Sequence, residues 1–234
     1  MATQESNSDR YEHPDPMLPH GDSLKEACGV VGVYANGEEA ARAVFFGLYA
    51  LQHRGQESAG IAASDGVNLR IHTEMGLVGQ AFQEYDLSGL SGHIAVGHTR
   101  YSTTGSSNIN NAQPILSNGP GVNIALGHNG NVINAVDLRK ELNDWGIEFK
   151  TTADSEIIAH MISNAPAESW SERAAYVMRK LKGAYSLVMM TKNQMVAMRD
   201  PLGVRPLCIG KLRGGWVIAS ESCALDHIGA EFYR

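Results

Sequence analysis

The most constraining feature of this 234-residue sequence is the irregular order of its apolar segments and helical repeats. Four short apolar segments follow one another with no helix between them and predict strands at residues 184–190, 195–198, 207–209 and 216–219. Strands that do not alternate regularly with helices favour antiparallel sheets covered by helices over a doubly wound parallel sheet. We therefore expect one α+β domain over residues 28–234.

Other segments complete this prediction. Apolar segments predict strands at residues 28–34, 58–63, 68–73, 93–99 and 122–127, and helical spacing predicts helices at 38–52, 135–145, 154–163, 171–182 and 222–227. The pair Asp65–Gly66 predicts a hairpin turn. The polar stretch 100–121 predicts one long loop, and loops of that length are usually functional or disordered.

Residues 1–27 differ in composition from the rest of the chain. They hold six acidic side chains, two basic side chains and three prolines, with almost no large aliphatic residues. Such a segment cannot bury enough apolar surface to order itself. It also lacks the basic start and apolar run of a secretory signal. We interpret it as a disordered tail or as a propeptide that is removed.

Composition excludes several classes of protein. The net charge is −6 and no Lys/Arg cluster is present, which argues against nucleic-acid binding. No apolar run is long enough to cross a membrane. Cys28, Cys208 and Cys223 are too few and too scattered for a disulfide framework or a cysteine-rich metal site. The nine histidines show no metal-ligand spacing. We expect a reducing, cytoplasmic location.

Cys28 is the first candidate catalytic residue because it lies where the acidic segment meets the first predicted strand. A free cysteine in an apolar strand is usually a packing residue. Removal of residues 1–27 would instead place an α-amine, with a pKa of about 7.7–8.0, beside the Cys28 thiol. An N-terminal residue can then act as nucleophile and general base at once. Both interpretations stay open from the residues alone.

Three polar positions have both a structural and a functional interpretation. Residues 128–131 (HNGN) are typical of a turn, but the Asn129 amide and the Gly130 N–H could also stabilise an oxyanion. Arg100 is either a surface residue or a clamp for a carboxylate. Asp154 is either a helix N-cap or a partner for an ammonium group. Arg100 and Asp154 together would recognise an α-amino acid.

A further distinctive stretch, residues 199–207 (RDPLGVRPL), predicts a rigid Pro/Gly corner held by a salt bridge.

Five motifs follow one another along the chain: Cys28–Gly32 (CGVVG), Leu51–Gly60 (LQHRGQESAG), Gly97–Gly105 (GHTRYSTTG), His128–Asn131 (HNGN) and Thr152–Glu156 (TADSE). In this order they resemble the glutaminase domain of the class II, or N-terminal-nucleophile, glutamine amidotransferases. The resemblance runs from residue 28 to the end of the sequence. It implies a four-layer αββα sandwich of the N-terminal-nucleophile hydrolase type.

The resemblance also implies roles for individual residues. Cys28 would attack the side-chain amide of glutamine, with its freed amine moving the proton. Asn129 and Gly130 would stabilise the oxyanion. Arg100 would hold the carboxylate of glutamine and Asp154 its ammonium group.

Other residues of the pocket also take their roles from the resemblance. Tyr101 would couple closure of the loop 100–111 over glutamine to a partner site. Arg54 would line and brace the pocket.

Three features resemble the branch of the family that uses the ammonia on phosphoribosyl pyrophosphate in purine synthesis. They are residues 53–57 (HRGQE), Tyr101, and residues 200–207 (DPLGVRPL). The hexosamine-forming branch is the alternative. The resemblance implies a phosphoribosyltransferase domain or subunit as partner, and a homo-oligomer. Mg²⁺ and, in one branch, a [4Fe–4S] cluster would belong to that missing C-terminal domain, with no cofactor in residues 28–234.

The sequence has two alternative interpretations besides an amidotransferase. A chain in which Cys28 is never unmasked would be a non-catalytic glutamine-binding module. A papain-like thiol protease would need the sequence signature that surrounds its cysteine, and Cys28 lacks it.

Overall fold

The computed structural model describes residues 28–35, 37, 39–101, 108–120 and 122–234. Its strands are β1 (Gly29–Ala35), β2 (Ser58–Ser64), β3 (Leu69–Met75), β4 (Ile94–Arg100), β5 (Ile115–Gly119), β6 (Val122–Val132), β7 (Gly183–Met190), β8 (Met195–Arg199), β9 (Cys208–Leu212), β10 (Gly215–Ala219) and β11 (Glu231–Phe232). Its helices are α1 (Ala40–Ala50), α2 (Val78–Ala81), α3 (Glu84–Gly89), α4 (Ala135–Asp144), α5 (Asp154–Ser163), α6 (Trp170–Lys180) and α7 (Ser222–His227), with 3₁₀ turns at Gln52–Arg54 and Ile109–Asn111.

These strands form two antiparallel sheets. The larger has the order β11-β9-β10-β1-β4-β2-β3, and the smaller has the order β5-β6-β7-β8. In the larger sheet β1 lies between β4 and β10, with Gly29 opposite Thr99 and Val31 opposite Ala219. The expected preference for antiparallel strands over a doubly wound sheet is confirmed.

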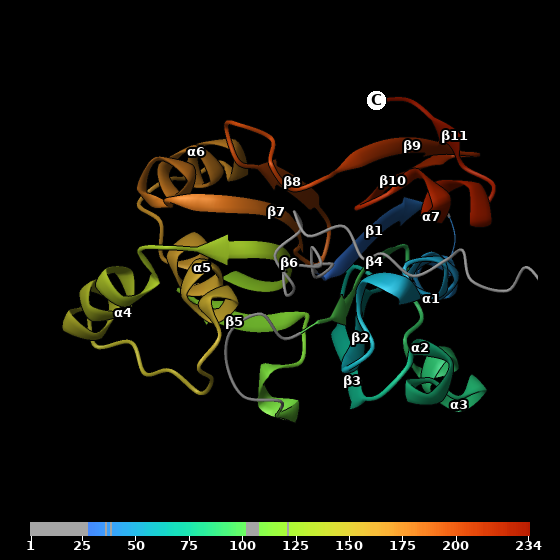
Figure 1. Ribbon diagram of the computed structural model, residues 1–234, viewed down its shortest axis with the longest axis horizontal. Coiled ribbons are helices and arrows are strands. Elements are labelled where there is room, and N and C mark those ends of the chain that lie inside the picture. The colour runs from blue at the N-terminus through green and yellow to red at the C-terminus, as the bar shows by residue number, and fades with distance from the viewer. Residues whose placement is uncertain (1–27, 36, 38, 102–107, 121) are drawn as a thin grey trace, which may run out of the picture.

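The two sheets pack face to face, and helices cover the outer face of each. Figure 1 shows the larger sheet with α1, α2 and α7 on one side of the molecule and the smaller sheet with α4, α5 and α6 on the other. Three apolar clusters fill the spaces between these four layers. The middle cluster, which includes Val30, Val96 and Val188, joins the two sheets. The predicted α+β, αββα sandwich is thereby confirmed.

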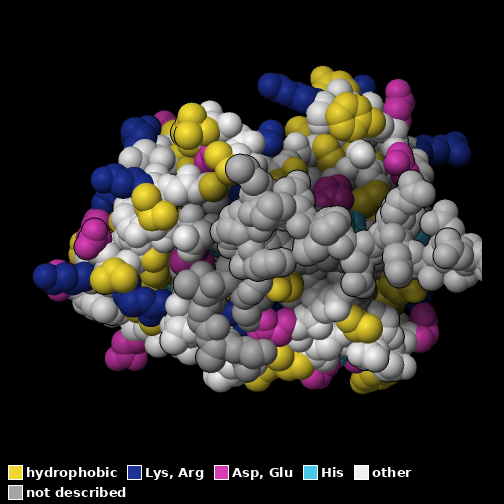
Figure 2. Space-filling view, viewed as in Figure 1, with side chains coloured by type: hydrophobic (Ala, Val, Ile, Leu, Met, Phe, Trp, Pro, Cys, Tyr) yellow, Lys and Arg dark blue, Asp and Glu magenta, His cyan; other side chains and the backbone are white. Residues whose placement is uncertain are grey.

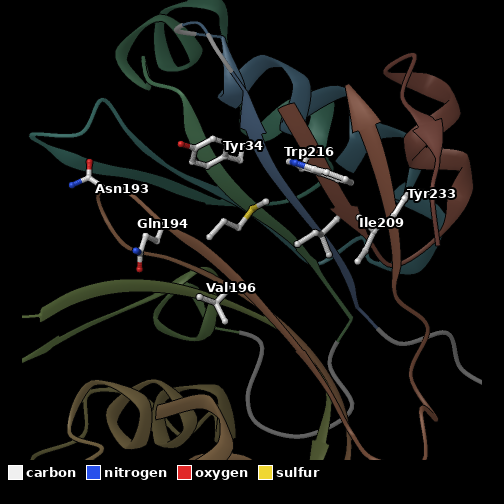
Figure 3. Close-up of a pocket in the computed structure, with 9 residues that line it drawn as sticks. Tyr34, Asn193, Gln194, Val196, Ile209, Trp216 and Tyr233 are labelled. Carbon is white, nitrogen blue, oxygen red and sulfur yellow. The ribbon is translucent and has the colours of Figure 1, made fainter. Parts of the chain in front are cut away.

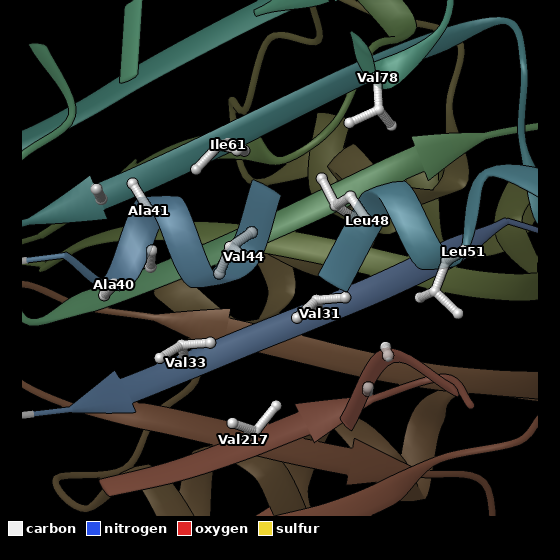
Figure 4. Close-up of a cluster of buried hydrophobic side chains, with 14 of the residues drawn as sticks. Val31, Val33, Ala40, Ala41, Val44, Leu48, Leu51, Ile61, Val78 and Val217 are labelled. Carbon is white, nitrogen blue, oxygen red and sulfur yellow. The ribbon is translucent and has the colours of Figure 1, made fainter. Parts of the chain in front are cut away.

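Helix α1 illustrates why the outer layers form. Its residues Ala41, Val44 and Leu48 recur at helical spacing and are all buried. Figure 4 shows these side chains of α1 with Val31 of β1, and all four belong to one buried apolar cluster. Helix α1 thus covers β1, the strand that begins directly after Cys28.

The exterior carries both signs of charge. On the face shown in Figure 2, Lys/Arg and Asp/Glu side chains are interspersed around the rim. In the parts of the chain that the structure describes, no helix is both long enough and apolar enough to span a membrane.

The hairpin between β2 and β3 is confirmed, and Asp65 holds its turn. The Asp65 carboxylate accepts the N–H groups of Val67 and Asn68 at 2.8 and 2.7 Å, and Arg70 donates to it at 2.9 Å. Local acceptance of backbone N–H groups by an aspartate is a common way to fix a turn.

The predicted loop over residues 100–121 is wrong in part. Residues 102–107 lie outside the described part of the chain, but Ile109–Asn111 form a 3₁₀ turn and Ile115–Gly119 form β5. Strand β5 has buried Ile115 and Ser117 alternating with exposed residues. Its polar residues hid this alternation in the sequence.

The predicted turn at residues 128–131 is also wrong. Strand β6 continues through Val132 because β7 pairs with it along this whole stretch, with Asn129 opposite Ser186 and Gly130 opposite Tyr185. Gly130 has a φ of +155°, which an extended strand accommodates here only with glycine. The short elements α2, α3 and β11 were not predicted.

The corner after β8 is confirmed as rigid, but side chain–backbone hydrogen bonds hold it in place of the expected salt bridge. Asp200 accepts the N–H groups of Leu202 and Val204, and Arg199 donates to the carbonyl groups of Gly203 and Arg205.

The close approach of the sheets at Gly32 gives a test of the fold. A Cβ atom at this position would lie 2.6 Å from Val188 Cγ1 and 2.7 Å from Met195 Sδ. We expect Gly32→Ala to lower the free energy of unfolding by about 1–3 kcal/mol, as overpacked cores do. Gly89→Ala is the control, because a Cβ at Gly89 meets nothing within 4 Å. Equal urea midpoints for the two variants would contradict the described packing of the sheets.

Candidate functional site

Cys28 lies directly before β1, at the edge of the space between the two sheets. Its Sγ atom is 3.4 Å from the backbone N and 3.5 Å from the backbone O of Tyr101. The antiparallel pairing of β1 with β4 causes this contact, since Gly29 is opposite Thr99. Cys28 as a whole residue is half-buried.

The surroundings of this thiol favour its protonated form. Burial raises the pKa of the Cys28 thiol, and the Tyr101 backbone N–H and the Arg100 guanidinium oppose that rise without cancelling it. The Asp154 carboxylate raises the pKa further. The thiol is thus uncharged at neutral pH, and it needs a base before it can act as a nucleophile. Arg100 ends strand β4 of the larger sheet and Asp154 begins helix α5, which covers the smaller sheet. Both nevertheless act on the Cys28 thiol electrostatically.

Arg100 ends β4, and its side chain is buried. Its Nη1 atom lies 2.7 Å from Oε1 of Glu57, a residue that directly precedes β2. This carboxylate offsets the cost of burying the guanidinium. Sequence reasoning assigned no role to Glu57, because 43 residues separate it from Arg100.

Asp154 is the first residue of α5 and lies beside the end of β6. The alternative role of helix N-cap is wrong, since Ala153 occupies that position. Asp154 Oδ2 accepts the N–H of Val132 at 3.0 Å, and His128 Nδ1 lies 3.5 Å from Oδ1. Burial opposes ionisation, but His128 and the N–H groups of Val132 and Ser155 outweigh it and hold the pKa of Asp154 below its usual range.

Asn129 is fully buried in β6, yet both Nδ2 and Oδ1 of its amide have no hydrogen-bond partner among the described residues. Gly127, two positions earlier and so on the same face of the strand, faces Val30 and Val96 of the larger sheet. The Asn129 amide therefore faces the sheet that carries Cys28. A buried amide with unused donor and acceptor is typical of a group kept for a ligand.

Gly130 follows with a backbone that only glycine allows. A Cβ atom there would lie 2.2 Å from the carbonyl oxygen of Ala184.

His98 supports the peptide next to Asn129 from the opposite sheet. Its Nε2–H donates to the carbonyl oxygen of His128 at 3.0 Å. Burial is the main cause that lowers the pKa of His98 to about 3, so the imidazole is neutral and can keep this bond at physiological pH.

Arg54 lies in the 3₁₀ turn after α1 and is buried. Its Nε–H donates to the carbonyl oxygen of Cys28 at 3.1 Å, and Nη1 bonds Glu221. Arg54 therefore braces the backbone of the candidate nucleophile, and its cation is already paired with a carboxylate. The side chain of Tyr101 is partly exposed, and most of the loop that follows it lies outside the described residues.

Metal binding finds no support in this part of the fold. Within residues 28–35, 37, 39–101, 108–120 and 122–234, no three His, Cys, Asp or Glu side chains gather as a metal site. Cys208 donates its thiol to the carbonyl of Ala219 and lies buried.

A separate cavity of about 750 Å³ opens between β8 and the strands β9 and β10. Figure 3 shows Tyr34, Trp216 and Tyr233 among the side chains around it. Tyr34 is six residues beyond Cys28 on an extended strand, which puts about 20 Å between the two backbones. This mainly apolar cavity is therefore not the candidate site.

Comparison with known proteins agrees with the geometry. A family model described as "Glutamine amidotransferase domain" matches residues 98–227, which is more than half of the chain. The chain belongs to the glutamine amidotransferase domain family. The resemblance drawn from the five motifs is confirmed, and the matched span of this amidotransferase domain contains Arg100, Asn129, Gly130 and Asp154.

Two relatives of this domain are named amidophosphoribosyltransferase. The chain is 47% identical over 219 residues to the amidophosphoribosyltransferase of Mycobacterium tuberculosis, and the match covers 91% of this chain and 42% of the relative. It is 50% identical over 229 residues to the amidophosphoribosyltransferase of Synechococcus elongatus, covering 94% of this chain and 46% of the relative. The chain thus spans less than half the length of these relatives.

A solved structure confirms the fold of the domain. The glutamine phosphoribosylpyrophosphate (PRPP) amidotransferase from B. subtilis, complexed with ADP and GMP, matches with a TM-score of 0.82 and 41% identity. The match covers 88% of this chain and 45% of that chain.

Glu156, which sequence reasoning did not assign, braces the turn that precedes Asp154. Its carboxylate accepts the N–H groups of Lys150 and Thr151 at 2.8 and 2.7 Å. Burial opposes ionisation, but His160 and these donors outweigh it and lower the pKa of Glu156 to about 2. The bonds hold the segment from which Asp154 enters α5.

The pKa of Glu156 predicts a pH-dependent contribution to stability. Because the folded pKa of about 2 is below the unfolded value of about 4.3, the carboxylate stabilises the fold above that unfolded value and loses its effect as pH falls toward 2. We expect Glu156→Gln to lower the free energy of unfolding by about 1–3 kcal/mol at pH 7. The deficit should shrink as pH falls from 5 to 2. Urea titrations of parent, Glu156→Gln and the exposed control Glu148→Gln measure it, and a constant deficit would contradict the assignment.

Proposed function

We propose that this domain hydrolyses the side-chain amide of glutamine at Cys28 and supplies the ammonia to a phosphoribosyltransferase partner in purine synthesis. The observation that carries the proposal is the convergence of one cation and one anion on a protonated thiol. Arg100 and Asp154 both influence Cys28 electrostatically. An α-amino acid has the complementary pair of charges, so such a site suits glutamine.

The thiol needs a base, and we propose that the α-amine of Cys28 provides it once residues 1–27 are removed. The amine takes the thiol proton as Sγ attacks the amide carbon of glutamine. It then gives the proton to the departing nitrogen, so that ammonia leaves and a thioester remains on Cys28. Water adds to the thioester, its proton returns through the amine to sulfur, and glutamate leaves.

The negative oxygen formed in each step needs hydrogen-bond donors. Asn129 supports this role because its buried Nδ2 has no partner among the described residues and its strand faces β1. The Gly130 N–H would be the second donor, as in other oxyanion sites built from backbone and amide groups. Arg54, which bonds the Cys28 carbonyl, would hold the nucleophile in place.

The acceptor of the ammonia is proposed from the relatives. They are named amidophosphoribosyltransferase and are more than twice as long as this chain. A phosphoribosyltransferase domain or subunit is accordingly the proposed partner, with Tyr101 at the junction between the two sites. These names favour the purine branch over the hexosamine-forming branch. We further propose a homo-oligomer that acts in the cytoplasm.

Intact-protein mass combined with a glutamine-mimicking diazo-ketone tests the nucleophile. We expect a chain that begins at Cys28, one adduct on Cys28, and glutamate release that Cys28→Ala abolishes. The control is Cys208→Ala, which removes another thiol, bonded to the carbonyl of Ala219 in the neighbouring strand, and should keep both activity and labelling. Glutamine binding by calorimetry without glutamate release from the processed chain would establish the binding-module alternative and refute hydrolysis.

Substitution of Asn129 tests the oxyanion site. We expect Asn129→Ala to lower kcat by about 10²–10³-fold with a small change in the KM for glutamine, because the donor acts in the transition state. Asn143→Ala, which removes an exposed amide on α4, is the control. A large rise in KM at constant kcat would instead assign Asn129 to ground-state binding.

A further inference from the structure

Glu221 lies at a point where the far end of the chain meets the candidate nucleophile. The preceding residue, Ser220, continues the pairing of β10 with β1: its N–H donates to the Val30 carbonyl at 3.0 Å, and its Oγ accepts the Val30 N–H at 3.0 Å. These two bonds hold Ser220 beside Val30, which is two residues after Cys28 in the sequence. Glu221 is therefore held in a defined place beside the start of β1.

The carboxylate of Glu221 bonds two neighbouring side chains of the 3₁₀ turn at Gln52–Arg54. Oε1 accepts from Nη1 of Arg54, and Oε2 lies 3.0 Å from Nε2 of His53. Arg54 in turn donates Nε–H to the carbonyl oxygen of Cys28 at 3.1 Å. A continuous chain of hydrogen bonds thus runs from Glu221 through Arg54 to the nucleophile.

Capping does not explain this carboxylate. Glu221 occupies the N-cap position of α7, yet its side chain makes no capping hydrogen bond. The carboxylate instead faces the turn at Gln52–Arg54. Burial opposes its ionisation, but Arg54 and His53 outweigh that effect and keep the pKa of Glu221 below its usual range.

Arg54 depends on this partner. Its side chain is 9% exposed, whereas that of Glu221 is 30% exposed. A buried guanidinium without a carboxylate would carry an uncompensated charge and would move toward water or another anion. Such a movement would break the bond from Nε to the Cys28 carbonyl. That carbonyl is one bond from the Cα atom that bears both the thiol and the α-amine.

We propose that Glu221 is a positioning residue for Cys28: it anchors Arg54, and Arg54 fixes the carbonyl group and hence the orientation of the thiol and α-amine. The inference rests on the proposed hydrolysis of glutamine at Cys28. Among the described residues, the carboxylate of Glu221 bonds His53, Arg54 and Cys223 and is linked to Cys28 through Arg54, so we expect its effect to be confined to the geometry of attack. A displacement of about 1 Å between reacting groups can cost about 10²-fold in rate.

Steady-state glutaminase kinetics of Glu221→Ala and Glu221→Gln test the proposal. We expect Glu221→Ala to lower kcat about 10- to 100-fold, with the KM for glutamine within about threefold of the parent, because Arg100 and Asp154 still hold the substrate. Glu221→Gln keeps an oxygen acceptor for Arg54 but not the compensating charge, so it should recover part of the lost kcat. Labelling of Cys28 by the diazo-ketone should slow in parallel with kcat.

The control is Glu84→Ala, which breaks the exposed pair of Glu84 with Arg42 on the outer helices. It removes the same kind of carboxylate–guanidinium pair and should leave kcat unchanged. Thermal melting of each variant identifies any loss of folding, and Glu221→Gln retains the test if Glu221→Ala unfolds.

The outcomes separate the two proposals. A parent chain that begins at Cys28 but releases no glutamate refutes the proposed function, and this inference with it. An active parent whose folded Glu221 variants keep the parental kcat refutes only the positioning role. Equal losses in kcat for Glu221→Ala and Glu221→Gln, or a rise in KM that accounts for the whole effect, would also overturn it.

Discussion

The antiparallel pairing of β1 with both of its neighbours is the constraint on which the site depends. On one side, Gly29 pairs with Thr99 and brings the Cys28 thiol to the backbone of Tyr101. On the other side, Ser220 bonds Val30 through both its backbone and its hydroxyl. The nucleophile thus extends a central strand rather than a loop, and rigid elements hold reacting groups more accurately than loops do.

The smaller sheet and the helix over it contribute the polar groups of the candidate site that the larger sheet does not carry. Strand β6 presents a buried amide toward β1, and α5 starts at Asp154 just beyond the same strand. The apolar layer between the sheets, with Val30 and Val96 from the larger sheet and Val188 from the smaller, sets their spacing. Because protein interiors are close-packed, that layer leaves the sheets little freedom to shift, and the polar groups at its edge keep their relative positions.

Local patterns predicted the parts of this structure that depend on local chemistry. The helical spacing of Ala41, Val44 and Leu48 predicted α1, and Asp65 predicted its hairpin. The continuation of β6 through Gly130 was missed because pairing with β7 overrides the turn preference of an Asn–Gly pair. The residues of the recognised motifs were singled out from the sequence as candidates, but the ion pairs beside them were not.

Those missed ion pairs share one physical reason. Glu57 and Glu221 pair with Arg100 and Arg54 across 43 and 167 residues of sequence, and no periodicity connects such positions. Each buried cation near the thiol has its own carboxylate. Asp154 adds a further carboxylate whose pKa is held below its usual range, so the site offers both guanidinium and carboxylate groups, which suits a zwitterionic ligand better than one with a single sign of charge.

The pairing of β1 with β10 also governs how the domain comes to be formed. Val30 and Ser220 are 190 residues apart, so the strand next to Cys28 cannot acquire both neighbours until almost the whole domain has left the ribosome. Folding is slowed because the entropy of closing a loop of that length is lost before strand pairing can stabilise the chain. A nascent chain therefore holds a cysteine without its surroundings, and the reactive arrangement arises only on completion of the fold. The order of synthesis itself thus delays the assembly of the structure around Cys28.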